Sequence, residues 1–188
     1  MYYIKNFILF SILGYIFETL TAIIFNINSE SGFMYGPYTI VYGIGIVLMY
    51  LLYKKFRKVK PEPKKILYMF ISGFLTLMII ELIGGLLLKN IYDVTMWNYN
   101  KLPLNIGKYI SIEVTTIWTI GSILIYYYIK PITDKIIKKI PNFLAVGIFL
   151  IILLDFIITT IKTLIKKHTG LIMVYIIYII GFIILLIT

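Results

Sequence analysis

Long apolar runs, separated by short polar or basic segments, dominate the pattern along this chain. Each run is close to the ~20 residues that a helix needs to cross a ~30 Å hydrocarbon core. Because a backbone inside a bilayer must satisfy its own hydrogen bonds, we expect helices and not strands. The pattern predicts an all-α, polytopic transmembrane bundle of about six helices. The predicted spans are residues 7–25, 36–53, 66–88, 109–129, 143–161 and 170–187.

The spans divide the chain into one large unit and a short tail. Residues 1–161 hold the first five spans, and we expect them to form a single transmembrane bundle. Residues 162–188 form a C-terminal extension, whose apolar part predicts a sixth transmembrane helix. No composition shift or linker divides the bundle itself, which agrees with a one-domain length.

Composition supports a membrane protein and changes the meaning of the net charge. Of 188 residues, 61% are hydrophobic and 14% are charged, whereas an average soluble domain has ~25% charged residues. The mean hydropathy is +0.96, more apolar surface than a soluble core of this length can bury. The formal net charge of +10 would suggest nucleic acid in a soluble domain. Here the basic residues lie between apolar runs, so we expect membrane lipids with anionic headgroups as partners, and no nucleic acid.

Basic residues at the ends of the spans predict which loops face the cytoplasm. Residues 54–65 hold seven lysines and arginines, and residues 130–139 hold four lysines. Cytoplasmic loops carry the excess of Lys and Arg, and these segments are two spans apart, so both fall on that side. This places the N-terminus inside the cell and residues 26–35 and 89–108 outside. Four basic residues then fall outside against the rule: Lys162, Lys166, Lys167 and His168.

Four of the eight acidic residues lie within predicted spans. They are Glu18, Glu81, Glu113 and Asp155. A charge at the bilayer centre costs about 2.5–3.5 kcal/mol on insertion scales. We therefore expect these side chains to face the bundle interior, to be paired or to be protonated. The direction of each predicted helix puts all four in the outer half of the membrane.

Two interpretations of these acids remain open. In the first they form a substrate or ion site that opens to the outside, with Glu18 and Glu81 its best candidates. In the second each acid is neutral or paired and joins helices, with Lys89, Lys108 and the tyrosines as available partners. Small or hydroxyl residues share a helix face with the acids, as close helix packing requires. They are Gly14, Thr21, Gly84, Gly85, Thr116 and Thr159.

The two predicted outer loops are rich in aromatic residues, glycine and asparagine. Trp and Tyr are enriched at membrane–water interfaces, so anchoring there is one interpretation. The other is a lid over the acids, held by hydrogen bonds from asparagine and aromatic side chains. The candidate residues in these loops are Tyr35, Trp97, Asn98, Tyr99 and Asn105.

Several motifs, taken together with their spacing, resemble a known family. Residues 14–18 resemble its Gly-aromatic-x-x-Glu in the first helix, and Glu81 with Gly85 resembles its Glu-x-x-x-Gly in the third. Residues 32–37 resemble its first outer loop. The other matching positions are Tyr42, Gly43, Trp97, Tyr99, Pro103, Asn105, Gly107 and Trp118. The chain thus resembles the bacterial family named putative ABC-transporter type IV, or CmpB-like, over about residues 7–160.

The resemblance implies a multi-pass protein of the bacterial cytoplasmic (inner) membrane. The chain has no Gly-x-x-x-x-Gly-Lys-Ser/Thr phosphate loop, so any ATPase of the system would be a separate subunit. We expect a permease-like transporter component for an unidentified small molecule or ion, with no cofactor, metal or catalytic residue. Two alternatives stay open: an intramembrane enzyme acting on lipid or cell-wall precursors, or a non-catalytic scaffold or substrate-binding subunit.

Overall fold

The computed structural model describes the backbone of residues 1–26 and 33–187 and the side chains of these residues up to 167. Helices make up nearly all of its regular structure, with one two-stranded antiparallel ladder in the loop before α4. The elements are α1 (Tyr2–Ile24), α2 (Ile40–Phe56), α3 (Glu62–Tyr92), β1 (Asn105–Ile106), β2 (Ile110–Ser111), α4 (Ile112–Leu124), the π-helical turn η1 (Ile125–Ile129), α5 (Lys130–Lys139) and α6 (Asn142–Ile187).

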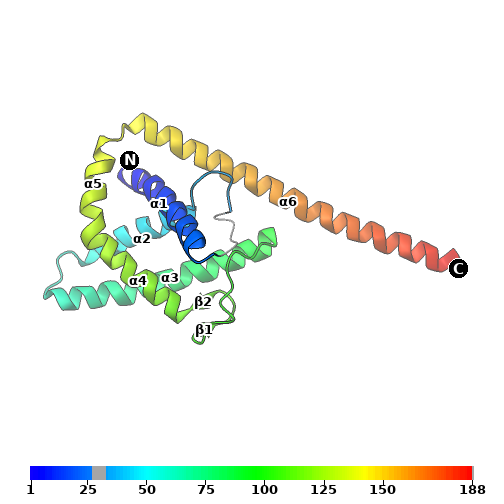
Figure 1. Cartoon of the computed structure of the whole chain (residues 1–188), viewed down its shortest axis with the longest axis horizontal. Coiled ribbons are helices and arrows are strands. Elements are labelled where there is room, and N and C mark those ends of the chain that lie inside the picture. Colours follow the sequence, from blue (N-terminus) through cyan, green and yellow to red (C-terminus); the bar gives the residue numbers. More distant parts are fainter. Residues whose placement is uncertain (27–32, 188) are drawn as a thin grey trace.

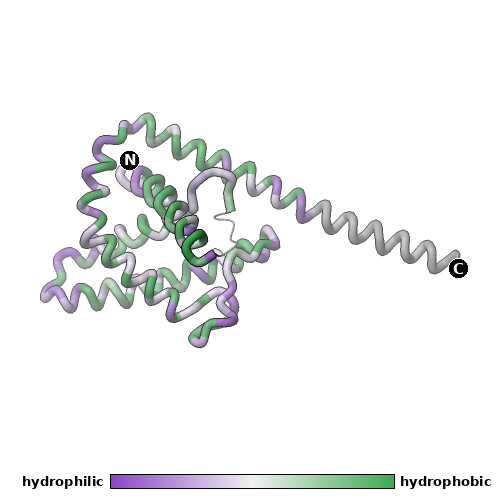
Figure 2. Tube along the Cα trace, in the orientation of Figure 1, coloured by the Kyte–Doolittle hydropathy of each residue, from purple (hydrophilic) through white to green (hydrophobic). Residues whose placement is uncertain are grey.

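The helices confirm the predicted all-α membrane fold. Within the part of the chain that the structure describes with side chains, four helices are long and apolar enough to cross a membrane. Large apolar side chains point outward along them, such as Ile79 at 57% exposure and Leu154 at 57%. Figure 2 shows hydrophobic residues along α1, α3 and the first part of α6. The four helices are Tyr2–Ile24, Glu62–Tyr92, Ile112–Lys139 and Asn142–Lys167.

Three boundaries differ from the predicted spans. Residues 36–39 belong to a loop, and α2 begins at Ile40, because Gly36 and Pro37 are poor helix formers. The fourth helix continues past residue 129 through η1 into α5. No break separates the predicted fifth and sixth spans, since α6 runs without interruption across residues 162–169. The predicted sixth span, 170–187, lies outside the residues whose side chains the structure describes.

The antiparallel pair of α1 and α2 is packed most closely. Gly43 of α2 lies against Ser11 and Phe7 of α1, with no room for a larger side chain. At the start of α2, the Thr39 amide donates to the Ser11 carbonyl oxygen at 2.9 Å. α3 packs on α2 and α4, and α6 closes the bundle against α1 and α3 (Figure 1).

One end of the bundle gathers the N-terminus, the 57–61 turn and α5, and we call it the basic end. The Tyr2 hydroxyl donates to Asp134 of α5 at 2.8 Å. The Tyr127 hydroxyl donates to Glu62 at the start of α3. These contacts bring together the segments that the distribution of lysines and arginines predicts to be cytoplasmic.

The opposite end carries residues 33–39 and 93–111, and we call it the loop end. The Phe33 ring contacts the Tyr92 ring near the end of α3, with ring centroids 5.1 Å apart. Both segments were predicted to lie on one side of the membrane, and their common end agrees with that grouping. Which end faces the cytoplasm stays a prediction.

Replacing Gly43 by alanine should weaken the α1–α2 contact. A Cβ atom there would lie 2.5 Å from the Phe7 carbonyl oxygen, and overpacking of this kind typically costs about 1–3 kcal/mol. Gly45→Ala is the matched control, because a Cβ at Gly45 would have nothing within 4 Å. Thermal unfolding in detergent should show a lower Tm for Gly43→Ala and an unchanged or raised Tm for Gly45→Ala. Equal effects would contradict the packing described.

Candidate functional site

Glu18 lies in the last turns of α1 and accepts hydrogen bonds from the start of α2. The Thr39 hydroxyl donates to Glu18 Oε2 at 3.2 Å. The Tyr42 side chain is a second hydrogen-bond partner of this carboxylate. Tyr42 can reach it because Gly14, one turn earlier in α1, leaves space for the Tyr42 ring. Tyr42 of α2 thus contacts both the glycine and the acid that share this face of α1.

Glu81 of α3 is held in the same way by a threonine and a tyrosine. The Thr115 hydroxyl of α4 donates to Glu81 Oε2 at 2.9 Å. Tyr99, from the loop between α3 and α4, is its second side-chain hydrogen-bond partner. Burial, and then the charge of Glu81, raise the pKa of Tyr99 above its usual range. The phenol therefore keeps its proton and acts as a donor.

The two acids lie near each other's tyrosines. Tyr42 and Tyr99 are neighbours, so Glu18, the two phenols and Glu81 form one polar cluster, without a direct hydrogen bond between the phenols among the described contacts. We call these four residues the tyrosine-bridged pair. Both carboxylates are partly buried, and within the described residues no lysine, arginine or histidine forms an ion pair with either. The described chain also has no group of three side chains suited to a metal ion.

Aromatic rings pack beside the Glu18 end of the pair. The Tyr42 ring meets the Trp118 ring of α4 nearly edge-on, with centroids 5.4 Å apart. Phe17, next to Glu18, completes the cluster at 5.8 Å from Trp118. The rings tie α1, α2 and α4 together beside Glu18.

The loop between α3 and α4 packs against α3, and this packing places Tyr99 beside Glu81. Trp97 packs over Gly84, where its ring atom would lie 3.3 Å from an added Cβ. Its indole nitrogen donates to the Tyr109 carbonyl oxygen at 3.3 Å. Asn105 donates to the Tyr99 carbonyl oxygen at 3.0 Å. Trp97 and Asn105 therefore position Tyr99 and do not themselves touch a carboxylate.

Asp155 of α6 holds the other loop, away from the tyrosine-bridged pair. Its carboxylate accepts the Gly36 amide at 2.8 Å, the Tyr38 hydroxyl at 2.5 Å and the Tyr35 amide at 3.3 Å. Thr159, one turn along α6, donates to it at 3.0 Å. Burial and the neighbouring carboxylate raise the pKa of Tyr38, so its hydroxyl stays a donor. With four donors around it, Asp155 is a fastening point for residues 35–38.

Glu113 stands in the first turn of α4 and organises the approach to that helix. It accepts the Leu104 amide at 2.9 Å and the Ser111 hydroxyl at 2.7 Å. Ser111 also accepts the Val114 amide at 3.3 Å as the N-cap of α4. An acid in the first turn is favourable because of the exposed amides and the helix dipole. The four predicted acids thus divide into one connected pair and two separate loop anchors.

Two of the candidate loop residues face outward. The Asn98 side chain is exposed and accepts the Asn100 amide at 3.0 Å, within its own turn. The Tyr35 ring is 67% exposed and lies under the Lys162 ammonium, 5.0 Å from its nitrogen. Neither side chain contacts Glu18 or Glu81 in the structure.

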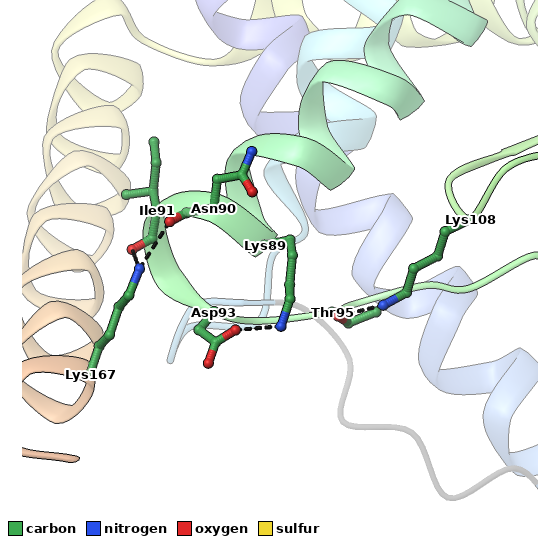
Figure 3. Close-up of polar contacts among 7 residues, drawn as sticks. All are labelled: Lys89, Asn90, Ile91, Asp93, Thr95, Lys108 and Lys167. Atoms are coloured by element: carbon green, nitrogen blue, oxygen red, sulfur yellow. Dashed lines mark hydrogen bonds and ion pairs between the residues drawn. The ribbon is translucent and has the colours of Figure 1, made fainter. Parts of the chain in front are cut away.

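Lysines at the loop end are used to fix the chain after α3 (Figure 3). Lys167 of α6 donates to the carbonyl oxygens of Asn90 and Ile91 at 2.9 and 3.1 Å. These carbonyls end α3 without a helical partner, and a cation is favoured there. Lys89 pairs with Asp93 and lowers the pKa of that carboxyl. The predicted alternative that Lys89 and Lys108 pair with intramembrane acids is therefore not what the structure shows, since Lys108 donates to Thr95 at 3.2 Å.

Sequence reasoning missed Thr39 and Thr115, which complete the pair. Tyr42 and Trp118 entered only as positions shared with a family. Thr116 was expected on the polar face of α4, but its neighbour Thr115 makes the contact to Glu81. Nothing in the local pattern distinguishes these two threonines, because the choice depends on how α4 is rotated against α3.

Comparison with known proteins agrees with the motifs quoted above. The family model described as "Putative ABC-transporter type IV" matches residues 5–164 of the chain. No curated protein and no solved structure matches the chain.

Removing the Asp155 carboxylate should release residues 35–38 from α6. Asp155→Ala leaves the Gly36 amide and Tyr38 hydroxyl without their acceptor, and hydrogen bonds to charged groups contribute about 1.5–3 kcal/mol each. The free energy of unfolding in detergent should fall by about 3 kcal/mol, and hydrogen exchange at Gly36 should accelerate. Asp93→Asn, at an exposed pair of the same loop end, removes a charge while tolerating the left-handed backbone at this position, and it should have a much smaller effect. A similar loss in both variants would contradict the anchoring role of Asp155.

Proposed function

Because the chain belongs to the putative ABC-transporter type IV family, we propose that it is a permease-like membrane component of a transport system. Four helices in the described part of the chain are long and apolar enough to cross a membrane. The sequence contains no phosphate loop, so in this proposal the ATPase is a separate polypeptide that binds to the chain. The tyrosine-bridged pair is the proposed site for the transported or coupling cation.

The observation that supports this site is that no compensating positive charge lies at it among the residues whose side chains the structure describes. Glu18 and Glu81 lie within spanning helices, and within that part of the chain each receives neutral donors, a threonine and a tyrosine. An ionised carboxylate at the bilayer centre costs about 2.5–3.5 kcal/mol on insertion scales. Neutral hydroxyls offset part of this cost, but they add no charge. A proton or a small cation would supply the missing charge.

The geometry suggests how such a site works. Each phenol donates one hydrogen bond and retains oxygen lone pairs, so the two tyrosines can orient carboxylates towards a cation shared between them. Tyr99 belongs to a loop and Glu81 to a helix, so movement of the loop would open or close one side of the site. In the proposed orientation this loop faces the outside, and the site exchanges its cation there.

Binding is testable through stability, because a ligand that binds only the folded state raises the Tm. Wild-type protein in detergent should unfold at a higher temperature when sodium or potassium replaces a bulky organic cation at constant ionic strength, or when the pH is lowered. At a concentration 100 times Kd the gain is about 2.7 kcal/mol, roughly 5–10 °C for a chain of this size.

Glu18→Gln and Glu81→Gln should abolish this dependence while the protein remains folded, because glutamine keeps an acceptor for threonine and tyrosine. Glu62→Gln at the basic end is the matched control and should respond like the wild type. The site assignment fails if both intramembrane variants respond like the wild type, or if the wild type responds to neither cations nor pH.

A further inference from the structure

α5 lies across the basic end of the bundle instead of continuing along α4. In Figure 1 it runs at a steep angle to α3 and to the first part of α6. The change of direction follows the π-helical turn η1, and Pro131 stands at the start of α5. Such turns commonly accompany functional features of helices. Since α3 starts at the same end, we take the spanning part of the apolar helix Ile112–Lys139 to end near η1, which places α5 at the membrane surface.

The side chains of α5 that face the bundle are buried or paired. Thr133 and Ile137 are buried at 3% and 2% exposure. Lys130 pairs with Asp134 at 2.5 Å and lies over the Tyr2 ring. The only acid of α5 is therefore engaged on the inner side, by a lysine and by the Tyr2 hydroxyl.

The outward side of α5 combines apolar and basic residues. Ile132 and Ile136 are exposed at 57% and 46%. Lys135, Lys138 and Lys139 are exposed as well, and no described residue forms an ion pair with them. A helix with an apolar strip flanked by lysines is typical of segments that lie in the interface of anionic membranes.

An open groove of about 330 Å³ lies at the corner where this side of α5 meets α6. Two lysines one helical turn apart stand beside a floor made almost entirely of apolar atoms. No acidic side chain lines the groove. The lining residues are Lys135, Ile136, Lys139, Ile140, Pro141 and Leu144.

We propose that this groove binds an anionic phospholipid of the leaflet at the basic end. The two lysines would hold the phosphate group, and the apolar floor would hold the first part of an acyl chain. Leu144 of the floor and its neighbour Phe143 are exposed apolar residues of α6, at 46% and 79%. This continuity with the surface along a spanning helix favours a lipid over a soluble protein, which would have to insert among lipids to reach the floor.

Native mass spectrometry of the full chain in detergent can test the groove with defined lipids. Phosphatidylglycerol and phosphatidylcholine of equal chain length are the two probes. We expect the wild type to retain phosphatidylglycerol more strongly. A polybasic contact near a membrane contributes about fivefold in affinity per lysine, so Lys135→Gln/Lys139→Gln should weaken phosphatidylglycerol binding by more than tenfold.

The control is Lys58→Gln/Lys60→Gln, which removes the same charge from the 57–61 turn at the same end. It should keep most of the phosphatidylglycerol binding, and both double variants should unfold near the wild-type Tm because they change exposed side chains. Soluble glycerol phosphate should not displace the lipid if the apolar floor contributes. Equal binding of the two lipids, or an equal loss in both double variants, would contradict the lipid site. The exposed lysines of α5 would then fit a protein partner better.

Discussion

Neutral donors surround the acids that this chain carries in its spanning helices. Glu18 and Glu81 each take one threonine and one tyrosine, Asp155 takes two amides and two hydroxyls, and Glu113 takes one of each. Lipid cannot satisfy a carboxylate, so the protein has to supply donors within reach. Because most of these donors come from another helix or a loop, satisfying the acids also fixes how the helices and loops are arranged.

This arrangement couples the loop end to the tyrosine-bridged pair. Tyr38 donates to Asp155, and the next residue, Thr39, donates to Glu18. A change in the charge of Glu18 therefore acts on the same short segment that Asp155 holds on α6. Tyr99 makes an equivalent connection between Glu81 and the second loop. In the proposed transport cycle, binding or release of a cation at the pair would alter the hydrogen bonds of both loops.

Four of the predicted spans could be recognised from the sequence because the bilayer imposes a simple requirement on length and polarity. The 17-residue α2 is too short to be counted with them, and the predicted fifth and sixth spans belong to one continuous helix. The acids could be identified for the same reason, since a carboxylate in an apolar run is costly wherever it points. Their partners could not, because Thr39 and Thr115 approach from other helices through packing. The direction of α5 could not be predicted either. Its lysines predicted a polar segment between spans, and only the position of the helix across the basic end shows that Ile132 and Ile136 face outward.

The distribution of lysines has a physical meaning that a count of charges does not reveal. At the loop end, Lys89, Lys108 and Lys167 are bound to a carboxylate, a hydroxyl and the terminal carbonyls of α3. Lys162 lies over the Tyr35 ring. At the basic end, by contrast, the outward lysines of α5 have no ion-pair partner among the described residues. Lys101 of the loop end is exposed and has no ion-pair partner among the described residues. Charges already bound within the protein interact less with the membrane surface than free ones, and more of the lysines at the basic end are free. The cytoplasmic position of the basic end stays a prediction from this excess of outward basic side chains, against which Lys162, Lys166, Lys167 and His168 lie near the other end of the spans.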